Sequence, residues 1–249
     1  MSEKGKYLYC IIKEKKPKEF NVLGIEGSKV YSISRGELSA VVSDAEIKEY
    51  SISRENTLTH QRIIEEIMKE YDVLPMSFGT IAESEKDIKE KILKPRAKEF
   101  LSAFEKIKGK VELNLKAIWL DMPSVFQELV KENKEIQIAK KEAARVSGIG
   151  RTNFAIEIGE IVAGALEEKK EREARDILKP LKKITEGFKE NKVQLDQVIF
   201  NTAFLVLKEK EKEFDKTVSA LGKKYGKTIK FIYVGPLPPF NFLELRLSA

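Results

Sequence analysis

The sequence contains one cysteine, Cys10, and one histidine, His60, in 249 residues. A structural zinc site takes four cysteine or histidine ligands, and a Ser-His-Asp or Cys-His catalytic set would depend on this single imidazole. Cys10 lies in an apolar segment and has no partner for an internal disulfide, which favours a buried thiol and a reducing cytoplasm. We therefore expect no zinc site and no disulfide, and we interpret His60 as a packed or capping residue.

Long apolar runs and ligand-binding motifs are also missing. No segment approaches the roughly 18 apolar residues of a transmembrane helix, and the start, MSEKGKYLYCII, lacks the apolar core of a signal peptide. No D-x-D-x-D-G calcium loop is present. The segment Gly148 to Arg151 lacks the Lys-Ser/Thr of a P-loop and follows a predicted helix, so we interpret it as a turn between helices. We expect a cytoplasmic protein with no membrane insertion, no metal and no cofactor.

Charge is abundant but mixed in sign. The chain has 46 basic and 40 acidic residues, a net charge of +6, and the two signs are interleaved, as in Glu209 to Lys216. No long basic block forms, which argues against nucleic-acid binding. Hydrophobic residues at 42% and charged residues at 35% indicate a folded protein with a Lys- and Glu-rich surface.

Two groups of residues could in principle form a catalytic or base-binding site, but each is better explained by an ordinary structural role. Glu112 and Asp121 flank an apolar strand, but their spacing places them on opposite faces of a regular strand, so we treat them as surface charges. Trp119, Phe126 and Tyr233 could stack on bases, but the glycine, basic and aromatic signature of RNA-binding ferredoxin-like domains is absent. We therefore assign the three aromatic residues to the core.

The first half of the chain predicts an α+β domain over residues 1–109. A buried strand at Tyr7 to Lys13 is followed by short strands at LGIEG, KVYSIS and LSAVVSD, which together predict a β meander. A helix then begins at Ser53, its candidate N-cap. Pro75 favours an edge or bulge for the next strand, and Pro95 should interrupt the following helix, residues 83–107.

The second half, residues 110–249, begins after Lys108-Gly109, where a helix stops at a glycine and a new strand starts. The pattern is a strand at 111–120, a long helical excursion at about 131–194 with breaks near residues 147–150 and Pro180, a strand at 198–207, a helix at 209–225 and a strand at 229–234. This order predicts a ferredoxin-like α/β sandwich with a long helical insertion.

Within the insertion, four apolar residues repeat at steps of four and three: Phe154, Ile158, Ile161 and Ala165. This spacing makes a narrow apolar seam suited to packing between helices, and we predict it as the candidate partner-binding surface. The sheet edge around Pro75 could also bind a partner, by strand addition, and the sequence does not choose between the two. The charged run from Glu167 to Glu173 follows, and we expect it to project into solvent or to support a helical hairpin.

Four blocks of the sequence resemble the gas vesicle protein family GvpF/GvpL: SRGELSAVVSD from Ser34, SRENTLTHQRIIEEIMKEY from Ser53, VLPMSFGTI from Val73 and IKFIYVGPLPPFNFLEL from Ile229. The resemblance covers most of the chain in order and is weakest over residues 131–194. It implies two α+β domains, the second related to ferredoxin, and no enzyme activity or cofactor. It also implies a minor gas vesicle component that associates with the major shell protein GvpA and other minor gas vesicle proteins.

We therefore expect a non-enzymatic assembly factor or minor structural component that binds GvpA and limits its aggregation. The alternative is a ferredoxin-like small-molecule or nucleotide-binding regulatory enzyme, although no titratable residues converge in the sequence. In the C-terminal block, Gly235 and three prolines predict a rigid corner that packs Phe240 or Phe242 against the C-terminal domain.

Overall fold

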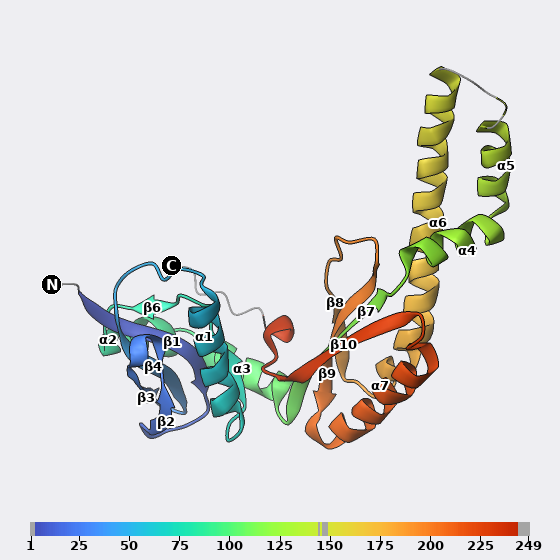
Figure 1. The fold of residues 1–249 in the computed structure, drawn as a ribbon. Coiled ribbons are helices and arrows are strands. Elements are labelled where there is room, and N and C mark those ends of the chain that lie inside the picture. The colour runs from blue at the N-terminus through green and yellow to red at the C-terminus, as the bar shows by residue number, and fades with distance from the viewer. Residues whose placement is uncertain (1–2, 144, 146–148, 244–249) are drawn as a thin grey trace. The chain divides into compact units, whose positions relative to one another are not determined.

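The computed structural model describes residues 3–143, 145 and 149–243 (Figure 1). The chain packs into two compact units. The first holds the residues up to Glu112 together with those from Gly235 onward, and the second holds Leu113–Val234. These units describe packing, and the expected domains, 1–109 and 110–249, stay a prediction.

The first unit is built on an antiparallel sheet. Its strands are β1 (Lys4–Ile12), β2 (Glu19–Leu23), β3 (Lys29–Arg35), β4 (Leu38–Glu46), β5 (Val73–Pro75) and β6 (Ile81–Ala82). They run in the order β2-β3-β4-β1-β5, and β6 also pairs with β1. The predicted meander is present, but the strand expected at LGIEG is wrong. Ile25–Gly27 forms a 3-10 turn in which Glu26 has a φ of 56°, and the strand lies just before it.

A bulge in β1 divides its side chains between two cores. Leu8 pairs with Val42 and Cys10 with Val41, so Tyr9 is an extra residue in β1. Tyr9 and Cys10 consequently lie in the same core cluster, with α1 (Arg54–Met68), while Leu8 lies in the other, with α3 (Ala97–Ile107). The sheet therefore has a helix on each face.

Helix α1 begins where the sequence predicts. The Ser53 hydroxyl accepts a hydrogen bond from the Asn56 backbone N–H at 3.1 Å, which satisfies one of the free donors of the first turn. The buried side chains of this helix are His60, Ile63, Ile64 and Ile67. The predicted N-cap is confirmed.

Replacing Ser53 with alanine is expected to lower the free energy of unfolding by about 1 kcal/mol, because the Asn56 N–H loses its acceptor. Urea denaturation at pH 7 measures this change. Ser51→Ala is the control, since its hydroxyl takes no part in the cap. A loss of equal size in both variants would contradict the capping role.

Pro95 interrupts the next helical segment as expected. A single turn, α2 (Glu85–Asp87), continues into a π-helical turn at Ile88–Leu93, and α3 starts only at Ala97. Phe100, Phe104 and Ile107 of α3 are buried in the core, together with Ile88.

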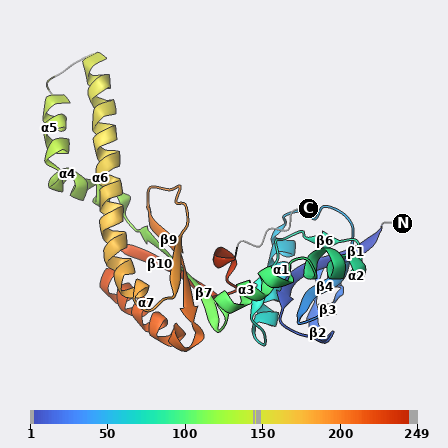
Figure 2. The ribbon, with the colours of Figure 1, turned by 180° about the vertical axis from the view of Figure 1, so that it is seen from behind.

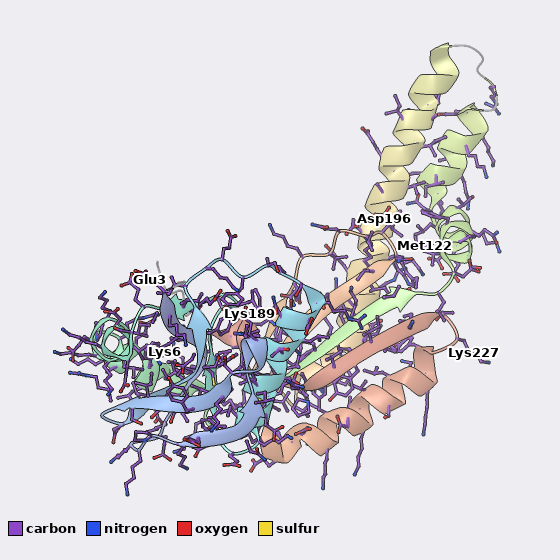
Figure 3. The ribbon with its side chains drawn as sticks, turned by 60° about the vertical axis from the view of Figure 1, so that its left-hand side comes forward. Glu3, Lys6, Met122, Lys189, Asp196 and Lys227 are labelled. Carbon is purple, nitrogen blue, oxygen red and sulfur yellow. The ribbon has the colours of Figure 1, made fainter. Side chains whose placement is uncertain are left out.

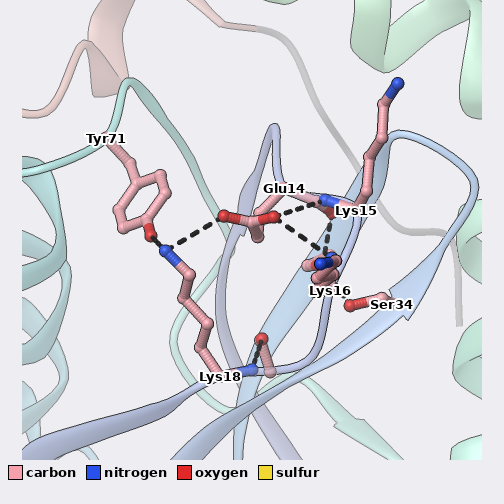
Figure 4. A network of polar contacts seen from close by, with 8 residues as sticks. Glu14, Lys15, Lys16, Lys18, Ser34 and Tyr71 are labelled. Atoms are coloured by element: carbon pink, nitrogen blue, oxygen red, sulfur yellow. Dashed lines mark hydrogen bonds and ion pairs between the residues drawn. The ribbon is translucent and has the colours of Figure 1, made fainter.

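The loop between β1 and β2 is held by one carboxylate (Figure 4). Glu14 accepts hydrogen bonds from the backbone N–H groups of Lys15 at 2.8 Å and Lys16 at 3.1 Å, and its carboxylate pairs with the Lys18 ammonium at 3.0 Å. Lys18 also donates to the Tyr71 hydroxyl. These contacts lower the pKa of Glu14, chiefly through the Lys16 N–H and the Lys18 ammonium. The Lys-rich loop is therefore ordered around its only acidic residue.

The second unit contains a four-stranded sheet in the order β10-β7-β9-β8. Its elements are β7 (Lys110–Trp119), α4 (Met122–Glu132), α5 (Lys134–Ala143), α6 (Ile149–Lys182), β8 (Gly187–Glu190), β9 (Val198–Leu207), α7 (Glu211–Tyr225) and β10 (Ile229–Leu237). The strands and helices follow one another in the βαββαβ order of a ferredoxin-like fold. Helices α4 to α6 together stand where that fold has its first helix. The α+β class is confirmed.

Two details of this unit differ from the expectation. Strand β8 was assigned to the helical excursion, which in the structure ends at Lys182. Pro180 lies inside α6, in its last turn, and the helix ends two residues later at Lys182, so the break predicted near Pro180 is the end of the helix. The expected break at residues 147–150 lies partly outside the described residues.

The C-terminal corner packs differently from the prediction. Asn241 donates hydrogen bonds from its backbone N–H and its Nδ2 to the Glu112 carboxylate, at 2.8 and 2.6 Å. Leu243 packs against the α3 side of the first unit's core, and Phe240 is exposed. The corner therefore groups with the first unit, and the expected packing of Phe240 in a core is wrong, whereas the expected packing of Phe242 stays a prediction.

Candidate partner-binding surface

Three helices of the second unit form an arm beside its sheet. Asp121 caps α4 by accepting from the Ser124 N–H at 3.3 Å, and Asn133 caps α5 by accepting from the N–H groups of Glu135 and Ile136 at 2.9 and 3.1 Å. Views from the front and from behind both show α5 alongside the N-terminal part of α6 (Figures 1 and 2). The insertion is thus a helical hairpin with α4 at its base.

The structure places all four predicted seam residues on α6, in the N-terminal half that forms the hairpin with α5. Phe154, Ile158 and Ile161 are half-buried, and Ala165 is buried. On α5, the buried residues are Ile136 and Ala139. The seam therefore lies in or beside the contact between α5 and α6, and its role in partner binding stays a prediction.

An ionic cluster fixes the base of the arm. Lys169 of α6 is buried and pairs with Glu128 of α4 at 3.0 Å and with Glu173 at 2.9 Å, while the Trp119 indole N–H donates to Glu173 at 2.7 Å. Burial alone would lower the pKa of Lys169, but the hydrogen bonds to Glu173 and Glu128 outweigh it and raise the pKa. The segment Glu167 to Glu173 therefore supports the hairpin, which was one of its two expected roles.

The cluster lies at one end of the sheet, where β7 ends and β10 begins. The Leu120 N–H donates to the Thr228 carbonyl at 2.9 Å, and the view in Figure 3 labels Met122 and Lys227 at these two chain segments. A cavity of about 280 Å³ here is lined by residues of the cluster together with Asp121, Ser124, Lys227 and Thr228. Charged pairs that already satisfy one another line this cavity.

A larger groove, of about 480 Å³, lies between α6 and the β8 and β9 strands. Its apolar residues include Leu178, Val198 and Phe200, all buried. Four of its charged residues form two ion pairs, since Lys170 contacts Glu167 at 2.6 Å and Lys182 contacts Glu190 at 3.2 Å. No set of three His, Cys, Asp or Glu side chains among the described residues is arranged to hold a metal ion.

His60 is buried between β1 and the segment after β5. Its Nε2–H donates to the Met76 carbonyl at 3.1 Å, and its Nδ1 lies 3.1 Å from the Tyr7 hydroxyl. Because a carbonyl can only accept, Nε2 carries the proton, and Nδ1 accepts from Tyr7. Burial lowers the pKa of His60 to about 4 and raises that of Tyr7 to about 12. The imidazole is neutral and fully used in packing, as the sequence predicts.

The remaining candidates divide between core and surface. Cys10 is buried, and burial raises the pKa of its thiol. Trp119 is buried and Tyr233 stacks on Phe214, but Phe126 is exposed and not in the core. Glu112 is not a surface charge, because its side chain is buried and holds Asn241. Nothing in the local sequence indicates this pairing, since the two residues are 129 positions apart.

Comparisons with known proteins agree with this architecture. The chain is 25% identical to gas vesicle protein F of Dolichospermum flosaquae over 96% of this chain and 97% of that protein. It is 27% identical to gas vesicle protein F1 of Halobacterium salinarum, over 98% and 94%. The crystal structure of GvpF from Anabaena sp. PCC7120 has the same fold, with a TM-score of 0.88 and 22% identity over 99% of this chain and 100% of that one.

The family comparison covers almost the whole length. Residues 5–244 match the family described as gas vesicle synthesis protein GvpL/GvpF. This range contains the four sequence blocks that resemble the family, apart from Leu245. Among the described residues, no helix is both long and apolar enough to cross a membrane. The chain belongs to the GvpL/GvpF family of gas vesicle synthesis proteins.

Proposed function

We propose that this protein is a non-enzymatic assembly factor or minor structural component of gas vesicles that binds the major shell protein GvpA. In this role it acts in the cytoplasm, at the growing vesicle, and covers the apolar surface of the shell subunit until that subunit joins the wall. The observation that carries the proposal is the family match over residues 5–244. A shell subunit with a face toward gas exposes a large apolar patch when free, and such patches aggregate unless they are covered.

The helical arm supports this role better than the sheet edge at Pro75. β5 ends the strand order of its sheet, as expected for a strand with a proline, but all three of its residues are buried and only three could pair with a partner. The arm offers a longer apolar surface on α6. A helix laid against a helical surface is one of the common modes of peptide recognition.

Co-purification tests the proposal. The full chain, carrying an affinity tag, is co-expressed with GvpA from the same gene cluster and compared with an unrelated ferredoxin-like protein of similar charge. We expect GvpA to remain soluble and to elute with the chain. Insoluble GvpA and an empty eluate would overturn the proposal.

Deletion of the gene is expected to abolish or malform vesicles. Normal, buoyant vesicles in the deletion strain would count against the proposed role.

Ile158→Asp with Ile161→Asp tests the seam itself. Both positions are half-buried, so two carboxylates there are expected to lower the stability of the arm by about 2 kcal/mol while the sheet stays folded. If the seam contacts GvpA, binding should fall roughly tenfold or more. Circular dichroism and the co-purification yield are the two measurements. Unchanged folding together with unchanged binding would show that the seam is neither part of a core nor a binding interface.

A further inference from the structure

The two halves of α6 have compositions opposite to what their environments require. From Ile149 to Leu166 the helix contains three charged residues, Arg151, Glu157 and Glu160, whereas from Glu167 to Lys182 it contains eleven. The charged half nevertheless carries the residues that pack most completely, which are Ile177, Leu178 and Leu181. A helix that is apolar on most sides is normally buried, but among residues 154–166 of α6 only Ala165 and Leu166 are buried.

One face of that half is uncovered. Its residues, which we call the outer face of α6, are Ala155, Ile156, Gly159, Val162 and Ala163. Ile156 is 59% exposed, Val162 is half-buried and the other three are exposed. They follow the i, i+3, i+4 spacing of one helix side, and they are offset from the seam residues along the helix surface.

Gly159 is not needed for packing within the described chain. A Cβ built on it would meet no atom within 4 Å, so nothing here requires a residue without a side chain. Glycine in a helix interior costs about 1 kcal/mol relative to alanine. The distance between two packed helices depends on the side chains at their contact, so a glycine on an exposed apolar face allows a second helix to approach closely.

One border of the outer face, beside Ile156 and Ala163, is acidic. Glu160 follows Ile156 by four positions and precedes Ala163 by three, and Glu157 is its neighbour one turn earlier. Both carboxylates are exposed, and neither forms an ion pair with any side chain that the structure describes. This local negative charge contrasts with the net charge of +6 of the whole chain.

From these observations we propose that the outer face of α6 binds a helix of another protein, one with an apolar stripe bordered by Lys or Arg. A second copy of this chain, packed α6 against α6, would bring the acidic borders of two helices together, which is unfavourable. The inference rests on the proposed function only for the identity of the natural partner, GvpA. The face, its close approach and the sign of its charge come from α6.

Two synthetic helical peptides with the same apolar stripe test the charge. One has Lys at the stripe borders and the other has Glu, and each is titrated against the full chain by fluorescence anisotropy. We expect the Lys-bordered peptide to bind at least roughly tenfold more tightly, and Glu157→Lys with Glu160→Lys to reverse this preference. The matched control is Glu168→Lys with Glu171→Lys, two exposed residues of the charged half. Equal affinity for the two peptides, or no binding of either peptide, would overturn the proposal.

Substitutions at Gly159 test the close approach by moving stability and binding in opposite directions. Gly159→Ala and Gly159→Leu should raise the melting temperature or leave it unchanged, because both residues form helices better and open space surrounds the site. Gly159→Leu should nevertheless weaken the Lys-bordered peptide roughly tenfold, because its side chain holds the partner away. Unchanged binding by Gly159→Leu would refute the assignment, as would a dimer of the wild-type chain that this variant dissociates.

The two proposals can fail separately. If GvpA does not co-purify but the Lys-bordered peptide binds and responds to the α6 variants, the proposed function fails and the binding face stands. If GvpA co-purifies equally with the wild type, the charge-reversal pair and Gly159→Leu, the function stands and the assignment of this face is overturned.

Discussion

A chain that ends at Val234 is expected to lose on the order of 4 kcal/mol of unfolding free energy in the first unit. Three contributions are removed together. Glu112, which is 1% exposed, loses the two hydrogen bonds from Asn241, and the α3 side of the core loses Leu243. A hydrogen bond to a charged group contributes about 1.5 to 3 kcal/mol, and losing such a bond costs most when the carboxylate is buried.

Thermal melting of the full chain and three variants measures this effect. A chain that ends at Leu243 is the control, because it keeps Asn241 and Leu243, and we expect its melting temperature to match the full chain. Asn241→Ala removes the side-chain donor alone and should cost about 2 kcal/mol. If the chain ending at Val234 melts like the full chain but no longer binds GvpA, the corner is a docking site and not a structural element.

The strongest periodic segments were predictable from the sequence, because their local preferences agree with their environment. Ile63, Ile64 and Ile67 repeat on one side of α1 and are all buried, and the Ser53 cap marks its start. β7 and β9 are long strands whose apolar residues lie in the sheet of the second unit. The order of strands and helices then limits the fold to few arrangements.

What the sequence did not show depends on residues far apart in the chain. β8 has only four residues, GFKE, three of them exposed, and it is a strand because Phe188 and its neighbours pair with β9. Lys169 lies in a run that reads as a solvated surface, and it is buried only because Glu128 and Glu173 neutralise it. Charge and periodicity within a short window contain no information about such partners.

Between pH 4 and pH 7, His60 is expected to make stability depend on pH. Its pKa is lowered from 6.5 to about 4 by burial, so between these pH values the unfolded chain binds a proton that the folded chain does not. The stability that comes from keeping this imidazole neutral is complete above about pH 6.5 and is lost as the pH falls toward 4. The loss is about 3 kcal/mol, from the size of the pKa difference.

His60→Gln isolates this contribution, because glutamine does not titrate and other acidic effects are shared with the wild type. At pH 7 we expect the variant to be about 2 kcal/mol less stable, since it disturbs the contacts with Tyr7 and Met76. The difference between the two proteins should then shrink as the pH falls from 6.5 to 4.5, measured by urea denaturation at each pH. Parallel stability curves would mean that His60 titrates normally in the folded state. We expect the variant to bind GvpA as the wild type does at pH 7, because the imidazole is buried and its two ring nitrogens are already hydrogen-bonded within the first unit. Loss of binding without loss of stability would instead give His60 a direct role in the interaction.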